Sequence, residues 1–71
     1  MLYRLEIIGN YDKELIKKIQ DEHYGKVDGI YDLYSELYVR GYCNSYEKYR
    51  IYYVAYTLAK HKIDFKIRKV D

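Results

Sequence analysis

The stretch "KVDGIYDLYSELYVRGYC" (residues 26–43) decides which fold the rest of this chain can adopt. Along it, β-branched residues and tyrosines alternate with polar residues, and we identify no continuous helical stripe. Such alternation is typical of strands. It predicts a hairpin with strands near residues 26–31 and 36–42, joined around residues 32–35. Gly29 inside the first strand then indicates a bulge or bend.

The segments before this hairpin predict a strand followed by a helix. Residues 2–8, "LYRLEII", alternate and are rich in β-forming residues. Asn10 is a plausible N-cap for a helix that Gly25 would end. Between them the apolar residues have the spacing of an amphipathic helix. These apolar residues are Tyr11, Leu15, Ile16 and Ile19.

The segments after the hairpin predict a second helix and a last strand. Asn44 or Ser45 can cap a helix, and Glu47 lies three residues beyond Asn44, as in a capping box. The helix then runs from Tyr46 to about Lys62. "IDFKIRKV", residues 63–70, alternates apolar with charged residues and predicts a strand.

The resulting element order is βαββαβ in a single domain, residues 1–71. This order is that of the α+β ferredoxin-like fold, in which two helices cover one face of a four-stranded antiparallel sheet. The main alternative is an α+β arrangement in which the middle hairpin packs differently or pairs with another copy of the chain.

Five tyrosines lie within the eleven residues from Tyr46 to Tyr56. On a helical wheel they gather opposite an aliphatic stripe that includes Ile51 and Leu58. Tyrosine suits a surface that is alternately wet and covered, and it is enriched in interface hot spots. We therefore expect a protein-binding surface or a homodimer interface here; the alternative is that the rings pack on the protein's own loops or other helix, or are simply exposed. The residues are Tyr46, Tyr49, Tyr52, Tyr53 and Tyr56, with Arg50 and Lys60 at the rim.

An alternative function is binding of RNA or single-stranded DNA. The sequence "RGYCNSYE", residues 40–47, resembles RNA-recognition domains in the first three positions of their third-strand signature, which are basic, glycine and aromatic. That resemblance implies an open sheet face that stacks bases and contacts phosphates. The candidate residues on this face are Tyr38, Arg40, Lys66 and Arg68.

Composition argues against several other functions. The single cysteine, Cys43, excludes an internal disulfide, and no cysteine or histidine has metal-ligand spacing to another. We find no catalytic constellation and expect no enzyme activity, cofactor, metal, membrane span or signal peptide. Residues 1–36 carry five basic and eight acidic side chains, whereas residues 37–71 carry eight basic and three acidic ones. This asymmetry can steer an oppositely charged partner.

A small, proline-free chain with twelve tyrosines is similar in style to the inhibitors that phages encode against host defences, including anti-CRISPR proteins. The likeness covers size and composition and no motif. It implies a protein of phage or mobile-element origin that acts in the host cytoplasm. There it would block a host protein through the tyrosine-rich helix.

Overall fold

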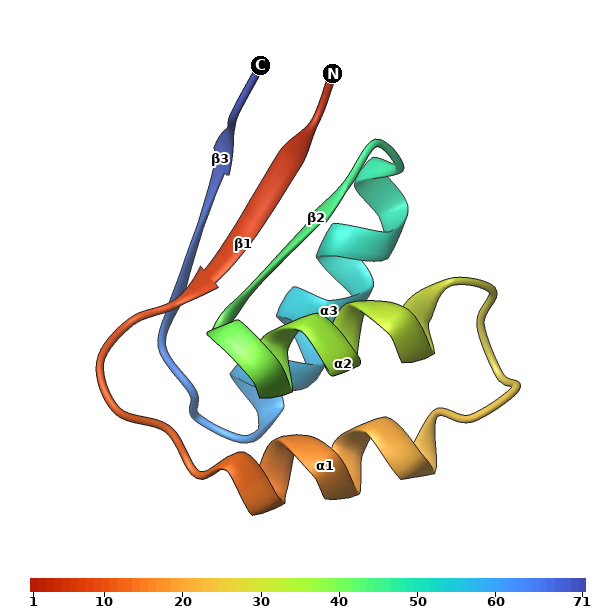
Figure 1. The fold of residues 1–71 in the computed structure, drawn as a ribbon, viewed down its shortest axis with the longest axis vertical. Helices are drawn as coiled ribbons and strands as arrows, with labels where there is room; N and C mark the ends of the chain where they lie inside the picture. Colours follow the sequence, from red (N-terminus) through yellow and green to blue (C-terminus); the bar gives the residue numbers. More distant parts are fainter.

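The computed structural model describes all 71 residues, Met1–Asp71. Three helices and three strands follow one another in the order β-α-α-β-α-β (Figure 1). Their bounds are β1 (Tyr3–Ile7), α1 (Lys13–Glu22), α2 (Ile30–Arg40), β2 (Tyr42–Ser45), α3 (Lys48–Lys60) and β3 (Phe65–Lys69). The strands predicted at the two ends of the chain and the helix before the last strand are therefore confirmed, with slightly shorter limits.

The predicted ferredoxin-like fold is wrong, because the chain has three strands and its middle segment is helical. No hairpin forms over residues 26–42; most of that segment is α2. The buried residues of α2 follow the spacing i, i+3, i+4, i+7, which is a helical stripe. The alternation of tyrosines with polar residues concealed this stripe. Its members are Ile30, Leu33, Tyr34 and Leu37.

Glycines set both limits of α2. Gly29 and Gly41 have φ angles of 81° and 82°, in the left-handed region that glycine enters without steric cost. The N–H group of Gly41 donates to the Leu37 carbonyl oxygen (2.9 Å), which closes the last turn. Gly29 is thus the N-cap of a helix and not a strand bulge. A Cβ atom there would lie 2.7 Å from the Arg50 guanidinium carbon.

The first helix begins two residues later than predicted. Asp12, and not Asn10, is its N-cap, because the Asp12 carboxylate accepts from the N–H groups of Glu14 (2.9 Å) and Leu15 (3.4 Å). The helix ends at Glu22, before Gly25 is reached.

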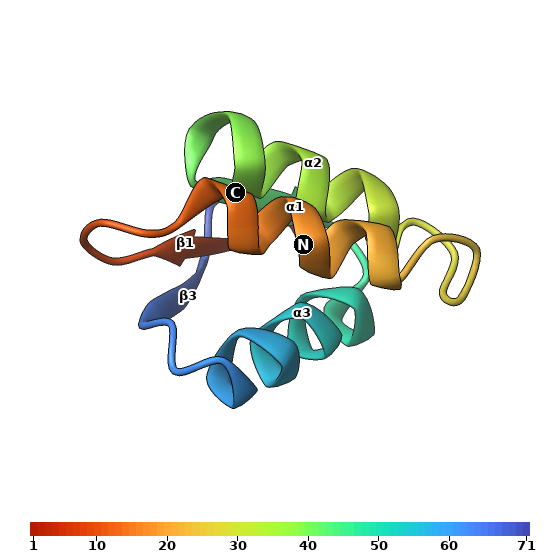
Figure 2. The same ribbon diagram turned by 90° about the horizontal axis from the view of Figure 1, so that it is seen from below.

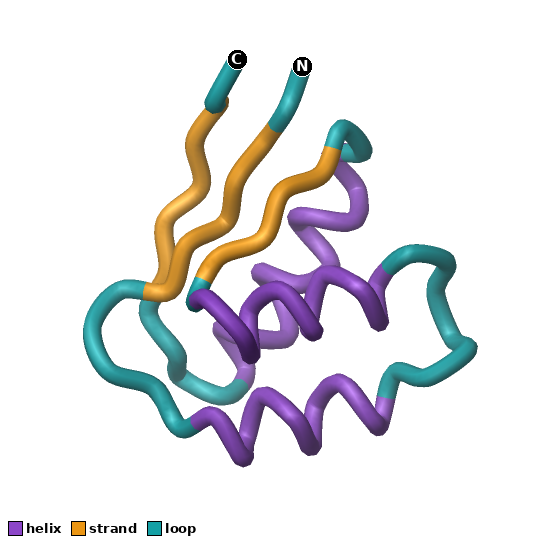
Figure 3. Tube along the Cα trace, in the orientation of Figure 1, coloured by secondary structure: helices purple, strands orange, loops and turns teal.

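β1 is the central strand of an antiparallel sheet with the order β2-β1-β3 (Figure 3). Leu5 lies opposite Cys43 on β2 and opposite Ile67 on β3. Because side chains alternate along a strand, these three share the inner face of the sheet. Arg4 and Glu6 point to the outer face, as the alternation of the sequence predicts.

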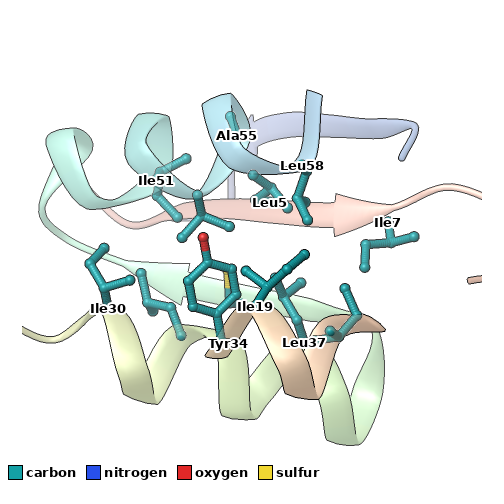
Figure 4. Packing of buried hydrophobic residues seen from close by; sticks show 13 residues of the cluster. Leu5, Ile7, Ile19, Ile30, Tyr34, Leu37, Ile51, Ala55 and Leu58 are labelled. Carbon is teal, nitrogen blue, oxygen red and sulfur yellow. The ribbon is translucent and has the colours of Figure 1, made fainter. Parts of the chain in front are cut away.

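The three helices lie together, with β1 and β3 to one side of them (Figure 2). α3 packs on β1 and β2, α2 packs beside β2, and α1 packs on α2. Their apolar sides meet the inner face of the sheet in one hydrophobic core (Figure 4). The core consists of Leu5, Ile7, Ile16, Ile19, Ile30, Leu33, Tyr34, Leu37, Cys43, Ile51, Val54, Ala55 and Leu58.

Tyr34 is the one core residue with a hydroxyl group. Its side chain is fully buried and points from α2 toward α3 (Figure 4). The hydroxyl has no hydrogen-bond partner in the structure. Burial raises the pKa of Tyr34 to about 12, and the smaller opposing effect of the nearby Thr57 hydroxyl does not cancel this rise.

We expect Tyr34→Phe to raise the free energy of unfolding by about 1 kcal/mol. A buried polar group without a partner costs about 1–3 kcal/mol, and phenylalanine keeps the ring while removing that group. Urea denaturation followed by circular dichroism at pH 7 measures the change. A loss of more than about 1 kcal/mol would instead show that the hydroxyl is bonded, with Thr57 as the nearest candidate.

The same variant should alter stability at alkaline pH. Burial also raises the pKa of the Cys43 thiol to about 12, and ordinary values are 9.0 for cysteine and 10.0 for tyrosine. The folded state therefore keeps protons that the unfolded state releases above pH 9–10. Stability is complete below this range and falls as the pH rises toward 12. Between pH 8 and pH 11, the free energy of unfolding of Tyr34→Phe should fall less steeply with pH than that of the unsubstituted chain, as measured by urea titrations. An unchanged slope would contradict the raised pKa of Tyr34.

Candidate protein-binding surface

α3 has two sides with opposite surroundings. The side that faces the sheet is aliphatic, and Ile51, Val54 and Leu58 on it have no exposed surface. The other side carries three large aromatic rings at spacings of three and four residues, so they share one face of the helix. They are Tyr49, Tyr52 and Tyr56, which are exposed by 55%, 54% and 63%. We refer to these three residues as the tyrosine face.

Cations adjoin the two ends of the tyrosine face. Arg50 donates from Nε to the Tyr49 hydroxyl (3.2 Å), and the Lys60 ammonium lies 5.5 Å from the centre of the Tyr56 ring. The Arg50 Cζ atom also lies 5.6 Å from the centre of the Tyr49 ring, so both cations are at cation–π distance and help to order rings that water surrounds. The predicted rim residues therefore do lie beside the tyrosines.

Arg50 also holds α3 to the loop before α2. Its guanidinium group forms an ion pair with Asp28 (3.3 Å) and lies over the backbone of Gly29. An arginine that is already engaged in this way contributes mainly to the position of α3. Lys60 is the rim cation that remains available to a partner.

Tyr53 does not belong to the tyrosine face, which corrects the prediction from the helical wheel. Its side chain is partly buried, and its ring meets the edge of the His23 ring at a centroid distance of 5.5 Å. His23 lies at the C-cap of α1, where Nδ1 is 2.7 Å from the Ile19 carbonyl oxygen, and its ring also contacts Tyr34 (5.2 Å). Tyr53 therefore joins α3 to α1 and α2.

Tyr46 lies in the turn before α3 and is 71% exposed, so it extends the aromatic surface beyond the helix. The capping box predicted for this turn does not form. Asn44 is in β2, and its side-chain oxygen accepts from Arg4 Nε (2.9 Å). The Ser45 hydroxyl instead accepts from the N–H group of Glu47 (3.0 Å) and so orders the turn.

Three of the four residues predicted for nucleic-acid binding reach the outer face of the sheet, and Tyr38 does not. Lys66 and Arg68 lie on the outer face of β3. Tyr38 is on α2 and not on a strand, and its ring lies 5.6 Å from the Lys13 ammonium of α1. Arg40 is the last residue of α2 and is paired with Glu36.

The aromatic ring that does lie on the outer face is Tyr42, which sequence analysis did not select. Two guanidinium groups cover it, since the Cζ atoms of Arg4 and Arg40 lie 4.3 Å and 4.2 Å from its centroid. A short strand in which Tyr42 alternates with Cys43 could have indicated from the sequence that Tyr42 lies on the outer face. Because cations already occupy the ring, it is not a free platform for a nucleic-acid base.

The cysteine and the two histidines lie in the core and at helix ends. Cys43 is fully buried in the core, and its raised pKa keeps it a neutral thiol at physiological pH. His23 and His61 are the C-caps of α1 and α3. No group of three or more histidine, cysteine, aspartate or glutamate side chains is arranged to hold a metal ion. The hollow of about 450 Å³ in the loop between α1 and α2 is lined by Tyr24, Gly25, Val27, Asp28, Gly29 and Tyr31.

No family model, curated protein sequence or solved structure matches this chain. None of the three helices has the length and apolar character needed to cross a membrane.

Replacing individual tyrosines of α3 with alanine should show which rings contribute to the core and which belong to the tyrosine face. We expect Tyr53→Ala to lower the free energy of unfolding by about 1–2 kcal/mol, because it removes a partly buried ring. Tyr52→Ala and Tyr56→Ala should change it by less than about 0.5 kcal/mol, because both rings face water. Chemical denaturation of the three variants measures this difference, and equal losses at all three positions would contradict it.

Proposed function

We propose that this chain is a non-enzymatic protein-binding module whose partner covers the tyrosine face. The observation that carries the proposal is the two-sided character of α3, with a fully buried aliphatic side and three exposed rings opposite. A helix that is apolar on two sides has a second surface to bury. The three rings together expose on the order of 300 Å². The largest apolar patch of a typical monomer covers about 300–600 Å² and is often functional, so the tyrosine face is of the size expected for such a patch.

Tyrosine suits this role because its ring gives contact area with few rotatable bonds, while its hydroxyl stays hydrated until a partner binds. Interfaces concentrate their binding energy in such aromatic anchors. We propose Tyr52 as the central anchor, with Tyr49 and Tyr56 beside it and Lys60 at the rim. The likeness to phage-encoded inhibitors implies that binding blocks a protein of a host cell, in its cytoplasm.

The nucleic-acid alternative has less support. Its cationic residues Lys66 and Arg68 are present on the outer face, but Tyr38 is on a helix away from the sheet. The Tyr42 ring that replaces it is covered by two arginines. Binding of a single strand would therefore depend on phosphate contacts alone, whereas the tyrosine face offers free rings.

A photo-crosslinking experiment tests the proposal. The chain is produced with benzoylphenylalanine in place of Tyr52, or in place of the exposed Lys18 on α1 as a control, and irradiated in lysate of the source cells. We expect one heavier protein adduct from position 52 and none from position 18. An adduct of twice the chain mass would identify a homodimer interface, and no specific adduct from position 52 would contradict the proposal.

Binding of the captured partner is then measured for the triple variant Tyr49→Ala, Tyr52→Ala, Tyr56→Ala. We expect affinity to fall at least about 30-fold, since hot-spot residues each contribute about 2 kcal/mol or more. Tyr24→Ala is the matched control, because Tyr24 is 75% exposed in another part of the molecule. If the triple variant bound as tightly as this control, the tyrosine face would not be the binding surface.

A further inference from the structure

The two edges of the sheet differ in how their backbone groups are used. Side chains of α2 close the β2 edge. The Ile7 N–H donates to the Gly41 carbonyl oxygen (2.9 Å), and antiparallel ladder bonds recur at every second residue, so Tyr42 and Asn44 direct their backbone groups away from β1. Arg40 Nε donates to the Tyr42 carbonyl oxygen (3.3 Å).

Glu36 completes this closure, because its carboxylate accepts from the Asn44 N–H group (3.4 Å) and pairs with Arg40. An ion pair on α2 thus covers polar groups that an added strand would use. The β2 edge is not available for strand pairing.

The β3 edge is open. Ile8 N–H donates to the Asp64 carbonyl oxygen (2.9 Å) and Val70 N–H to the Leu2 carbonyl oxygen (3.0 Å), so the even-numbered residues of β3 face β1. The odd-numbered residues therefore direct their N–H and C=O groups away from the sheet, and no side chain caps them. These residues are Phe65, Ile67 and Lys69.

The inner face beside this edge is incompletely covered. Phe65 and Ile67 are only partly buried, since α3 packs over β1 and β2. One side of α3 faces α1 through Tyr53, and its other side reaches the start of β1, where the Lys48 ammonium lies 5.4 Å from the Tyr3 ring. Tyr52 lies one turn after Lys48 and so shares the side of α3 that reaches β1, away from Tyr53.

The outer face of β3 carries two exposed cations, and Lys66 lies directly opposite the Glu6 carboxylate of β1. Lys66 and Arg68 are exposed and form no ion pair or hydrogen bond within the chain. Arg68 lies directly opposite Arg4 on β1, an arrangement of like charges that disfavours close approach. Arg4 turns instead toward Tyr42 and Asn44. The open edge therefore presents Phe65 and Ile67 on its inner side and the cations Lys66 and Arg68 on its outer side.

We propose that the β3 edge binds an extended acidic segment of the partner protein as a fourth strand, in which apolar residues alternate with aspartate or glutamate. The main chain of the segment would pair with the free groups of Phe65 and Ile67. Its apolar side chains would cover these two residues, and its carboxylates would face Lys66 and Arg68. The proposal rests on the proposed function and specifies the partner's chemistry. Strand addition is an established mode of peptide recognition.

Charge also disfavours a second copy of the chain as the strand that pairs with the β3 edge. Antiparallel pairing of two β3 strands would bring Lys66 and Arg68 of one copy onto the same outer face as those of the other. Like charges across strands are destabilising, and lysines on an edge strand commonly prevent such self-pairing. An acidic strand turns the same repulsion into attraction.

The probe is a fluorescein-labelled seven-residue peptide that alternates valine with glutamate. Fluorescence anisotropy at low salt should show binding to the full chain. Peptides with lysine in place of glutamate, or with the same residues in scrambled order, are the controls and should bind at least about tenfold more weakly. The double variant Lys66→Glu, Arg68→Glu should bind the parent peptide at least about tenfold more weakly. The double variant Lys17→Glu, Lys18→Glu on α1 should bind it as tightly as the unsubstituted chain.

Two measurements distinguish strand addition from simple charge attraction. Alternate amides of an added strand face the sheet, so N-methylation of either all valines or all glutamates should abolish binding, and methylation of the other set should not. Hydrogen exchange at the amides of Phe65, Ile67 and Lys69 should slow at least about tenfold with saturating peptide, since strand pairing protects backbone amides.

Several results would overturn the proposal. These are equal effects of the two methylated peptides, unchanged exchange at the three amides, and displacement of the peptide by a single-stranded oligonucleotide of higher affinity. A doubled mass without peptide, with those amides already protected, would assign the edge to self-association. Failure here leaves the proposed function standing if the Tyr49, Tyr52 and Tyr56 variants still lose the crosslinked partner. If the Tyr49, Tyr52 and Tyr56 variants still bind both the peptide and the crosslinked partner, the proposed function alone would be overturned.

Discussion

Burial of one side of α2 is the constraint on which the rest of the structure depends. The stripe that runs from Ile30 to Leu37 closes the core against α1 and α3. Its position beside β2 also places Glu36 and Arg40 against the outward backbone groups of that strand. A helix here, in place of a hairpin, leaves the sheet with three strands. One edge is closed by side chains and the other is open.

The open edge and the tyrosine face are consequences of the same small core. The helices cover the inner faces of β1 and β2. Too little chain remains to cover the inner face of β3 or the far side of α3. A chain of this length buries only about 60% of its unfolded surface. The apolar groups that remain partly uncovered include Phe65 and Ile67 on β3 and Tyr52 on α3.

The strands at the two ends of the chain and the aliphatic stripe of α3 could be predicted, because each follows one clear period. The middle segment could not be assigned by alternation, since tyrosine is compatible with both strands and helices. Tyr34 and Tyr38 were indistinguishable by residue type, yet one is fully buried and the other is only partly buried at the surface. Tyr53 was placed with the exposed rings because a helical wheel does not show that His23 lies beside it.

The sequence by itself determined the local periods that are unambiguous: alternation in β1 and β3 and the aliphatic stripes of α1 and α3. It also determined that α3 has aliphatic and aromatic sides. Only the tertiary structure decided which tyrosines face water and which edge of the sheet is free. Those properties depend on the neighbours that distant segments supply, and residue spacing within one segment carries no information about them.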